Sequence, residues 1–178
     1  MDKRLCHFLI GLPGAGKSTF AQVLIQINPH SVWICPDHIR EQLYGDASIQ
    51  GTWTEIQIMI DQQFDQAIKA QHPVIYDATN VKAQWRRDFL QRYSPPGIQW
   101  LGWQLNASAQ DCIHRNHLRS HAVPLKIILT YAQFLKDQPP SIAEGFLQIL
   151  PVPLNRQGQV NIKQMQQLIV VAQQRLSI

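Results

Sequence analysis

Apolar residues follow two different spacings along the chain, and the spacing predicts where strands and helices lie. Short, continuous apolar runs are typical of buried strands, and five of them occupy residues 5–10, 32–35, 73–77, 98–105 and 146–152. Elsewhere apolar residues recur every three or four positions, which indicates a helix after Ser18 that Asn28-Pro29 ends, and further helices at residues 38–44, 54–70, 83–93, 109–118, 124–136 and 162–176. This alternation predicts an α/β fold of three layers, with helices on both faces of a parallel five-stranded sheet. In the helix at 83–93, we expect Trp85, Phe89 and Leu90 to point inward.

Length and composition narrow the class of protein. The chain has 178 residues, 45% of them hydrophobic, and we expect a single domain over residues 1–178. Its net charge of +4 permits an anionic partner without requiring one. No apolar stretch approaches the roughly 20 residues of a membrane-spanning helix. The apolar start leads directly into a glycine-rich segment, without the small-residue cleavage site of a secretory signal. We therefore expect a cytoplasmic protein with no membrane partner.

The three cysteines, Cys6, Cys35 and Cys112, are odd in number and far apart in the sequence. Two of them lie in or beside apolar strands, so we expect buried free thiols. The chain has no Cys-x-x-Cys pair, which disfavours a zinc site.

A phosphate-binding pattern, G-x-x-x-x-G-K-[ST], occurs near the start of the chain as Gly11-Leu12-Pro13-Gly14-Ala15-Gly16-Lys17-Ser18. Its glycines let the backbone approach the phosphates of a nucleotide, which bind to successive N–H groups and to the positive end of the following helix. We expect Lys17 to reach the β- and γ-phosphates and the Ser18 hydroxyl to coordinate Mg²⁺. The pattern lies between a predicted strand and a predicted helix, as this mechanism requires.

Two other interpretations of these glycines are weaker. A dinucleotide fingerprint, G-x-G-x-x-G, would begin at Gly14, but Thr19 stands where its third glycine belongs and Lys17 would crowd the pyrophosphate. A turn without a ligand would match the four fixed positions only by chance, at odds of roughly 1% in a chain of this length.

Asp37 directly follows the second predicted strand, and Arg40 lies one helical turn further on. The carboxyl ends of parallel strands share one crevice, so Asp37 can face the γ-phosphate and accept a proton from an attacking hydroxyl. The guanidinium of Arg40 can bind a phosphate of the acceptor with two bonds. The alternatives are a helix cap at Asp37 and an ion pair between the two residues.

Asp77 ends the third predicted strand, where a second acidic residue of a phosphate-loop enzyme supports Mg²⁺ directly or through water. Thr79 and Asn80 follow it. Each of them can either support the site or cap the next helix.

Residues 113–123 are predicted to form a mobile lid over the nucleotide, because few apolar residues interrupt their basic and polar side chains. Arg115 and Arg119 are four residues apart on one predicted helix face, where like charges repel unless an anion lies between them. The alternative is a solvated basic helix. The three histidines of this segment fit its polar face better than a metal site, since no nearby carboxylate completes one.

These motifs resemble those of the 5′-polynucleotide kinase branch of the phosphate-loop kinases. The resemblance extends to about Phe146 and rests on Gly11 to Thr19, Asp37-His38-Ile39-Arg40, Asp77-Ala78-Thr79-Asn80, Arg115-Asn116 with Arg119, Val123-Pro124 and Glu144-Gly145. It implies the P-loop NTPase fold with a helical lid. It also implies an ATP site made by Gly11, Pro13, Gly14, Ala15, Gly16, Lys17, Ser18 and Thr19, with Arg115 and Arg119 on the donor phosphates.

The same resemblance implies catalytic roles. Asp37 would be the general base for a 5′-hydroxyl, and Arg40 would contact the acceptor's neighbouring phosphate. Lys17 and Arg119 would act as catalytic cations, and Ser18 and Asp77 would hold Mg²⁺. His38 and Pro36 depart from the family pattern, in which some members have an acidic and a basic residue there. The departures leave the acceptor less defined than the donor.

We therefore expect a kinase that uses ATP and Mg²⁺ and whose acceptor is the 5′-hydroxyl of RNA or DNA. The second candidate acceptor is a small hydroxyl-bearing metabolite, sugar nucleotide or antibiotic, because kinases for such substrates share this architecture. The third is a regulatory protein that uses ATP hydrolysis as a timer, although Asp37 with Arg40 argues for transfer. The sequence leaves open the preference for RNA or DNA, the use of ATP or GTP, the oligomeric state, and whether Asp77 contacts Mg²⁺ directly.

Overall fold

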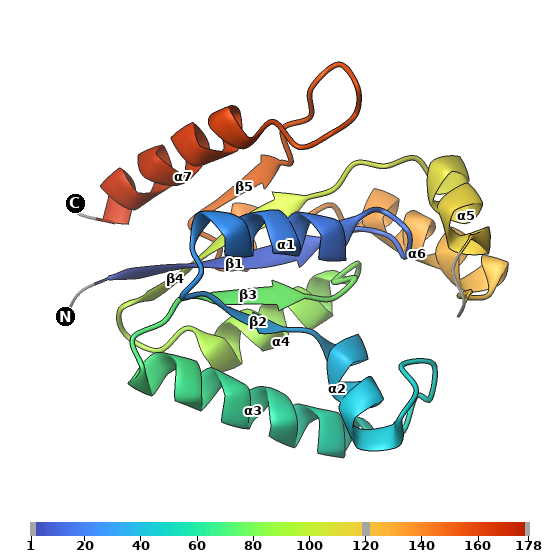
Figure 1. Ribbon diagram of the computed structural model, residues 1–178, viewed down its shortest axis with the longest axis horizontal. Helices are drawn as coiled ribbons and strands as arrows, with labels where there is room; N and C mark the ends of the chain where they lie inside the picture. Colours follow the sequence, from blue (N-terminus) through green and yellow to red (C-terminus); the bar gives the residue numbers. More distant parts are fainter. Residues whose placement is uncertain (1–2, 119–121, 177–178) are drawn as a thin grey trace.

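The structure is a computed structural model that describes residues 3–118 and 122–176 (Figure 1). The strands are β1 (Arg4–Ile10), β2 (Val32–Ile34), β3 (Val74–Asp77), β4 (Ile98–Gln104) and β5 (Gln148–Pro151). The helices are α1 (Lys17–Ile27), α2 (Pro36–Tyr44), α3 (Trp53–Lys69), α4 (Ala83–Tyr93), α5 (Ala109–His117), α6 (Leu125–Asp137) and α7 (Ile162–Leu176), with a 3₁₀ turn η1 (Ile142–Glu144). Within these two ranges, no helix combines the length and the apolar character needed to cross a membrane.

The five strands form one parallel sheet in the order β2–β3–β1–β4–β5 (Figure 1). At the centre, Leu9 of β1 is paired with Asp77 of β3 on one side and with Trp103 of β4 on the other. The predicted parallel sheet of five strands is confirmed. Because all strands run the same way, the loops that follow β1, β2 and β3 meet at one edge of the sheet.

Side chains of β1 alternate between two cores, as expected for a central strand that is buried on both faces. Phe8 lies on the face covered by α3 and α4, among other aromatic rings. Leu9 lies on the opposite face, which α1 and α7 cover. A third cluster joins Leu12 of the glycine-rich loop to Cys112 of α5 and Ile128 of α6. The helical layers on both faces confirm the predicted three-layer arrangement.

Several local expectations are wrong. Helix α1 begins at Lys17 and not after Ser18, and the strand expected over residues 146–152 is confined to Gln148–Pro151. Helix α2 begins at Pro36, two residues before the predicted start, because the fixed φ and missing N–H of proline suit the first helical turn. In α4, Trp85 is 40% exposed and does not point inward, whereas Arg86 is fully buried. The inward stripe of this helix consists of Arg86, Phe89, Leu90 and Tyr93. Arg86 can be buried because polar partners inside the molecule pair with it, as described below.

The prediction of buried free thiols is confirmed for Cys6, Cys35 and Cys112. Burial raises the pKa of all three thiols. They therefore stay protonated at neutral pH and pack as small apolar side chains.

Candidate active site

The loop between β1 and α1 has the backbone geometry of a phosphate cradle. Gly14 and Gly16 have φ values of 82° and 93°, in the left-handed region that favours glycine. A Cβ added to Gly14 would lie 2.5 Å from the carbonyl oxygen of Cys112, so no larger residue fits there. Gly16 is the N-cap residue of α1, and the N–H groups of the first helical turn, which have no carbonyl partner within the helix, therefore open onto the loop.

Lys17 lies against the backbone of this loop. Its Nζ donates hydrogen bonds to the carbonyl oxygens of Gly11, at 3.1 Å, and Leu12, at 2.9 Å. These bonds keep a positive charge beside the cradle, where the phosphates of a nucleotide would bind.

Asp77 lies next to the loop, at the end of β3. It is paired in register with Leu9, just ahead of the glycine-rich segment, and it is only 3% exposed. Burial raises the pKa of the Asp77 carboxyl. Lys17, together with hydrogen bonds from Ser18 and Trp33, opposes that shift. The indole Nε1 of Trp33 donates to Oδ2 of Asp77 over 3.3 Å.

This loop and Asp77 suit a nucleoside triphosphate with Mg²⁺. Mg²⁺ prefers oxygen ligands and usually takes one or two carboxylates from a protein, while phosphates and water supply the rest. The Ser18 hydroxyl lowers the pKa of the Asp77 carboxyl, so two such oxygen groups lie near each other beside the cradle. Across residues 3–118 and 122–176, no three or more His, Cys, Asp and Glu side chains gather to hold a metal.

Asp37 and Arg40 form an ion pair in the first turns of α2. Arg40 Nη1 lies 2.6 Å from Asp37 Oδ1, and the two side chains are 14% and 66% exposed, respectively. Asp37 does not cap α2, because Cys35 is the N-cap residue and no side chain caps the helix. The ion pair between Asp37 and Arg40, which the sequence offered as an alternative role, is present. Arg40 Nε is buried and has no hydrogen-bond partner among the described residues, which leaves a donor that an acceptor oxygen could satisfy.

Strand pairing brings Asp37 to the same edge of the sheet as Asp77. Ile34 of β2 is paired with Tyr76 of β3, so the loops after these strands are neighbours. The charge of Asp37 further raises the pKa of Asp77, which shows that the two carboxylates lie within electrostatic reach of each other. Helix α1, after β1, and helix α4, after β3, cover opposite faces of the sheet (Figure 1). Ligands of open α/β sheets bind at such a switch point.

Helix α5 lies against the phosphate loop through Cys112. Burial raises the pKa of the Cys112 thiol, and Arg115 and Lys17 both oppose the shift, so both cations lie within reach of it. Helix α5 ends at His117, and Arg119 lies outside the described residues. The predicted pair of lid arginines is therefore described only at Arg115.

Asn116 joins the two ends of the segment between α5 and α6. Its Nδ2 donates to the carbonyl oxygen of Val123 at 2.8 Å, and its Oδ1 accepts from the Val123 N–H at 2.9 Å. At 3% exposure, Asn116 is a buried clamp and not part of a solvated face. Apolar spacing did not reveal this role, since nothing in the sequence links residues 116 and 123.

Thr79 and Asn80 tie the loop after β3 to β1. Gly11 N–H donates to the carbonyl oxygen of Thr79 at 3.0 Å, and Asn80 Nδ2 donates to the carbonyl oxygen of Leu9 at 2.6 Å. Neither residue caps α4, whose N-cap residue is Lys82. Of their two expected roles, support of the phosphate loop is the one observed.

Arg86 joins three segments behind the site, a role that the sequence pattern did not reveal. Its Nε and Nη2 donate to the two carboxylate oxygens of Glu144 at 2.6 and 2.7 Å. Its Nη1 donates to the carbonyl oxygens of Asn80 and Val81, both at 3.1 Å, and Nη2 also donates to that of Gln138 at 2.8 Å. The signal that could have revealed it is an arginine within the apolar stripe of α4.

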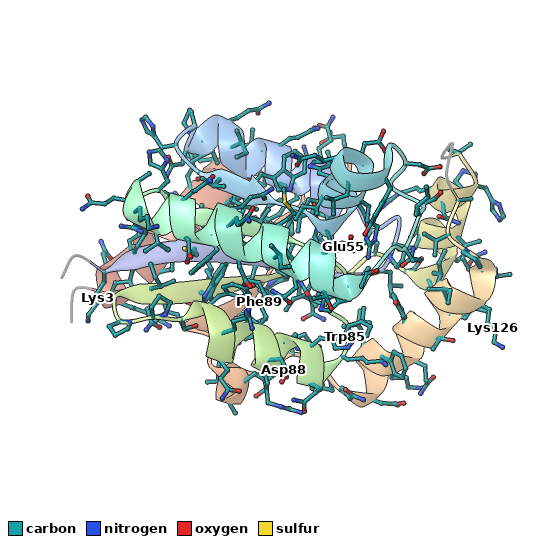
Figure 2. All side chains as sticks on the ribbon, turned by 90° about the horizontal axis from the view of Figure 1, so that it is seen from below. Lys3, Glu55, Trp85, Asp88, Phe89 and Lys126 are labelled. Carbon is teal, nitrogen blue, oxygen red and sulfur yellow. The ribbon has the colours of Figure 1, made fainter. Side chains whose placement is uncertain are left out.

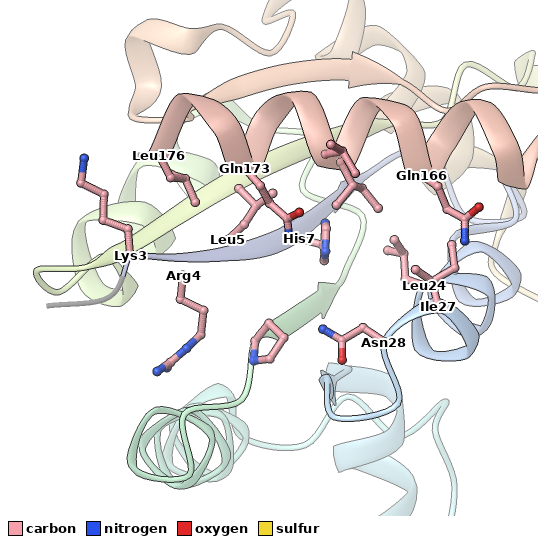
Figure 3. A pocket seen from close by; sticks show the side chains of 13 residues that line it. Lys3, Arg4, Leu5, His7, Leu24, Ile27, Asn28, Gln166, Gln173 and Leu176 are labelled. Carbon is pink, nitrogen blue, oxygen red and sulfur yellow. The ribbon is translucent and has the colours of Figure 1, made fainter. Parts of the chain in front are cut away.

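A groove of about 1060 Å³ lies away from this site, between β1, α1 and α7 (Figure 3). Its lining includes His7 of β1, Leu24 of α1 and Gln166 of α7. None of the predicted site residues that the structure describes lines it, so the groove is separate from the candidate active site.

Comparison with known families gives one match over most of the chain. A family model described as "AAA domain" matches residues 6–137. The match extends from β1 into α6, so it includes the phosphate loop, Asp37 and Asp77.

Solved structures of several kinases share this fold. The chain is 21% identical to a chain of the Pnkp1/Rnl/Hen1 RNA repair complex, with a TM-score of 0.69, over 77% of this chain and 45% of that one. It is 18% identical to a gluconokinase from Sinorhizobium meliloti, with a TM-score of 0.56, over 99% of this chain and 95% of that one. It is 12% identical to a fungal RNA kinase, with a TM-score of 0.58, over 99% and 98%. The chain thus spans less than half of the repair-complex chain, and these likenesses establish the fold of the P-loop kinases.

Proposed function

We propose that this chain, which belongs to the AAA domain family and has the fold of the P-loop kinases, is an ATP-dependent kinase that transfers the γ-phosphate to a hydroxyl group. We further propose that its acceptor is the 5′-hydroxyl of a polynucleotide. The observation that carries this proposal is the position of the Asp37–Arg40 pair directly after β2, which is paired with β3, the strand that ends at Asp77. One edge of the sheet thereby offers a triphosphate cradle, a carboxylate and a guanidinium.

The phosphate loop binds the donor. Backbone N–H groups around Gly14 and Gly16 contact the β- and γ-phosphates, and Lys17 stabilises the negative charge on the transferring group. Ser18 and Asp77 would hold Mg²⁺, which would act as a Lewis acid and neutralise negative charge on the phosphate oxygens. Arg115, with Arg119 of the predicted lid, adds positive charge from the side of α5.

Asp37 accepts the proton of the attacking hydroxyl. The hydroxyl oxygen forms a bond to the γ-phosphorus as the bond from that phosphorus to the bridging oxygen of ADP breaks. Arg40 binds the phosphate that follows the first nucleotide, and a phosphate oxygen there would satisfy its unpartnered Nε. Two of the similar structures, the RNA repair complex and the RNA kinase, support a polynucleotide acceptor by analogy.

A small hydroxyl-bearing metabolite is the second candidate acceptor. The likeness to a gluconokinase extends over 99% of this chain and 95% of that one. The side chain of Arg40 is also only 14% exposed, which suits a small enclosed substrate as well as a strand end.

Transfer of a labelled γ-phosphate tests the proposal. The protein is incubated with ATP and Mg²⁺ and, in turn, with a 5′-hydroxyl RNA oligonucleotide, the matching DNA, the same oligonucleotides with a 5′-phosphate, gluconate, and no acceptor. The proposal expects label on the 5′-hydroxyl oligonucleotides and none on their phosphorylated counterparts, with a KM that rises steeply with salt. Label on gluconate alone would identify a small-molecule kinase. ATP hydrolysis that is equally fast without an acceptor would identify a regulatory ATPase.

A further inference from the structure

Four side chains form a cluster between α4 and α6, which we call the aromatic cluster: Lys82, Trp85, Tyr131 and Phe134. The ammonium of Lys82 lies 4.7 Å from the ring centroid of Trp85 and 4.6 Å from that of Phe134. Trp85 and Tyr131 meet edge to face, with 6.0 Å between their centroids. Trp85 is nevertheless 40% exposed. Part of the Trp85 side chain is therefore open to solvent, while the Lys82 ammonium covers one face of its ring.

The aromatic cluster lies at the same edge of the sheet as the candidate active site. Lys82 is the N-cap residue of α4, and only a short loop separates it from Asp77 at the end of β3. In Figure 2, Trp85 on α4, Lys126 on α6 and Glu55 at the start of α3 all lie toward one end of the molecule. Helix α3 packs against α2, which carries the Asp37–Arg40 pair. A strand whose end reaches Asp37 could therefore extend over α4 and α6.

Charge differs between the two sides of this edge. Residues 36–69, which include α2 and α3, contain six carboxylates and two basic side chains. In the described part of residues 82–136, Arg86 is buried against Glu144 and Arg92 is paired with Asp61 of α3. That leaves five basic side chains, Lys82, Arg87, Arg115, Lys126 and Lys136, against two carboxylates. Arg87 on α4 and Lys126 on α6 are both exposed. A polyanion is therefore attracted to the side that carries the aromatic cluster.

A second exposed tryptophan gives a useful comparison. Trp53, at the start of α3, is 53% exposed, and the preceding residue, Thr52, donates its N–H to the hydroxyl of Tyr44 at the end of α2. Its neighbours in the sequence include Asp46 and Glu55, on the acidic side of the edge. Exposure alone does not distinguish Trp53 from Trp85, but the surrounding charge does, because carboxylates repel the phosphates of a strand.

We infer that the aromatic cluster binds the acceptor strand beyond its 5′ end, with a base of single-stranded RNA or DNA stacked on Trp85. The inference rests on the proposed function and gives the direction in which the polymer leaves Asp37. Proteins bind single strands by stacking bases on aromatic rings and by placing cations near the backbone, and Trp85 and Lys82 supply both. Because Lys82 and Tyr131 already hold the indole in place, stacking on it costs little further entropy.

Binding is measured with a fluorescently labelled single-stranded 5′-hydroxyl oligonucleotide of about ten nucleotides, and transfer is measured with the same oligonucleotide and with a 5′-hydroxyl dinucleotide. Trp85→Ala should weaken binding of the oligonucleotide about tenfold and raise its KM by a similar factor, with a smaller effect on the dinucleotide. Trp85→Phe retains a ring and should retain most of the binding. Trp53→Ala is the matched control and should bind as the unmodified protein does.

Lys82→Gln tests the same surface without removing the ring, in case Trp85→Ala does not fold. It should weaken binding by a smaller factor and make it less dependent on salt. Equal binding by the unmodified protein and by folded Trp85 and Lys82 variants would overturn the inference, while transfer to 5′-hydroxyl ends would uphold the proposed function. Binding that depends on Trp85 without any transfer would overturn the proposed function and with it the strand's role as acceptor. Weaker binding by Trp53→Ala alone would place the strand on the acidic side and overturn the inference.

Discussion

Trp33 and Asp77 are joined across neighbouring strands by a hydrogen bond of 3.3 Å, from the indole Nε1 to the carboxylate Oδ2. The same indole meets the ring of His38 edge to face, with 4.6 Å between centroids. His38 directly follows the proposed base, Asp37. One rigid side chain therefore orients the carboxylate proposed for Mg²⁺ and contacts the helix that carries the proposed base.

Replacing Trp33 with phenylalanine should raise the Mg²⁺ concentration that phosphate transfer requires. The variant keeps an aromatic ring beside His38 and removes the hydrogen bond that opposes the raised pKa of Asp77. Groups that orient a metal ligand typically contribute about 10–100-fold to metal affinity or activity. We expect the Mg²⁺ concentration for half-maximal transfer to rise about tenfold, with Trp53→Phe as an unaffected control. An unchanged Mg²⁺ dependence would show that Trp33 does not orient Asp77.

Asp37→Asn should remove transfer and preserve ATP binding. The amide fills the same space but cannot accept the proton, and general-base catalysis contributes roughly 10²–10⁴ in rate. The measurements are kcat for labelled-phosphate transfer and the Kd for ATP. Asp65→Asn, an exposed carboxylate on α3, is the control. Transfer at the unmodified rate would exclude Asp37 as the base.

Gly14→Ala should damage the phosphate loop more than a matched glycine replacement elsewhere. Both Gly14 and Gly158 have positive φ, at 82° and 75°, so both replacements introduce backbone strain of about 1–3 kcal/mol. Only at Gly14 would the new Cβ also approach a carbonyl, that of Cys112, to 2.5 Å. We expect Gly14→Ala to lose ATP affinity by at least about tenfold, while Gly158→Ala keeps it. Calorimetric titration with ATP distinguishes the two, and equal affinities would contradict the proposed cradle.

Arg86→Met should lower the free energy of unfolding by about 3–5 kcal/mol, because it leaves the carboxylate of Glu144 buried without its partner. The exposed neighbour replacement Arg87→Met should change it by less than about 0.5 kcal/mol. Replacing both Arg86 and Glu144 with apolar residues should cost less than the sum of the two single changes. Urea unfolding measures all of these variants. Similar midpoints for Arg86→Met and Arg87→Met would show that the buried pair has no structural role.

Acid should destabilise the fold through His7. Burial lowers the pKa of His7 from 6.5 to about 4, and its Nδ1 accepts a hydrogen bond from Trp103 Nε1 at 3.1 Å, which requires the neutral ring. Of the described side chains that line the groove in Figure 3, the charged ones are Lys3 and Arg4, so a protonated His7 meets only cations there.

The sign follows from the lowered pKa. The unfolded chain takes up a proton below about pH 6.5 and the folded chain only near pH 4, so the stability contributed by neutral His7 is present above pH 6.5 and is lost between these values. The loss is up to about 3 kcal/mol. His7→Gln should show a smaller decrease between pH 7 and pH 4 in urea unfolding. Parallel pH profiles for the two proteins would refute this role of His7.

Elements with a local pattern could be predicted closely. Helices α4 and α7 have the expected bounds, because apolar spacing at three and four residues reports directly on a helical face. The inward side of α4 could not be predicted in the same way. Arg86 is buried because Glu144 and Gln138, more than 50 residues further along the chain, supply its partners. Burial of a charge depends on such distant groups, which no local spacing records.

In the candidate site, too, some features follow from local sequence patterns and others depend on residues that are distant in the sequence. The phosphate loop is one contiguous segment between a strand and a helix, so residues 11–18 were sufficient to recognise it. That Asp37 follows a strand and Asp77 ends one could also be inferred from local patterns. The strand order β2–β3–β1–β4–β5, which makes these carboxylates neighbours and brings Trp33 onto Asp77 from 44 residues away, comes from the folded chain. Pairing between parallel strands joins segments that are remote in sequence, and packing of the whole core selects among the possible orders.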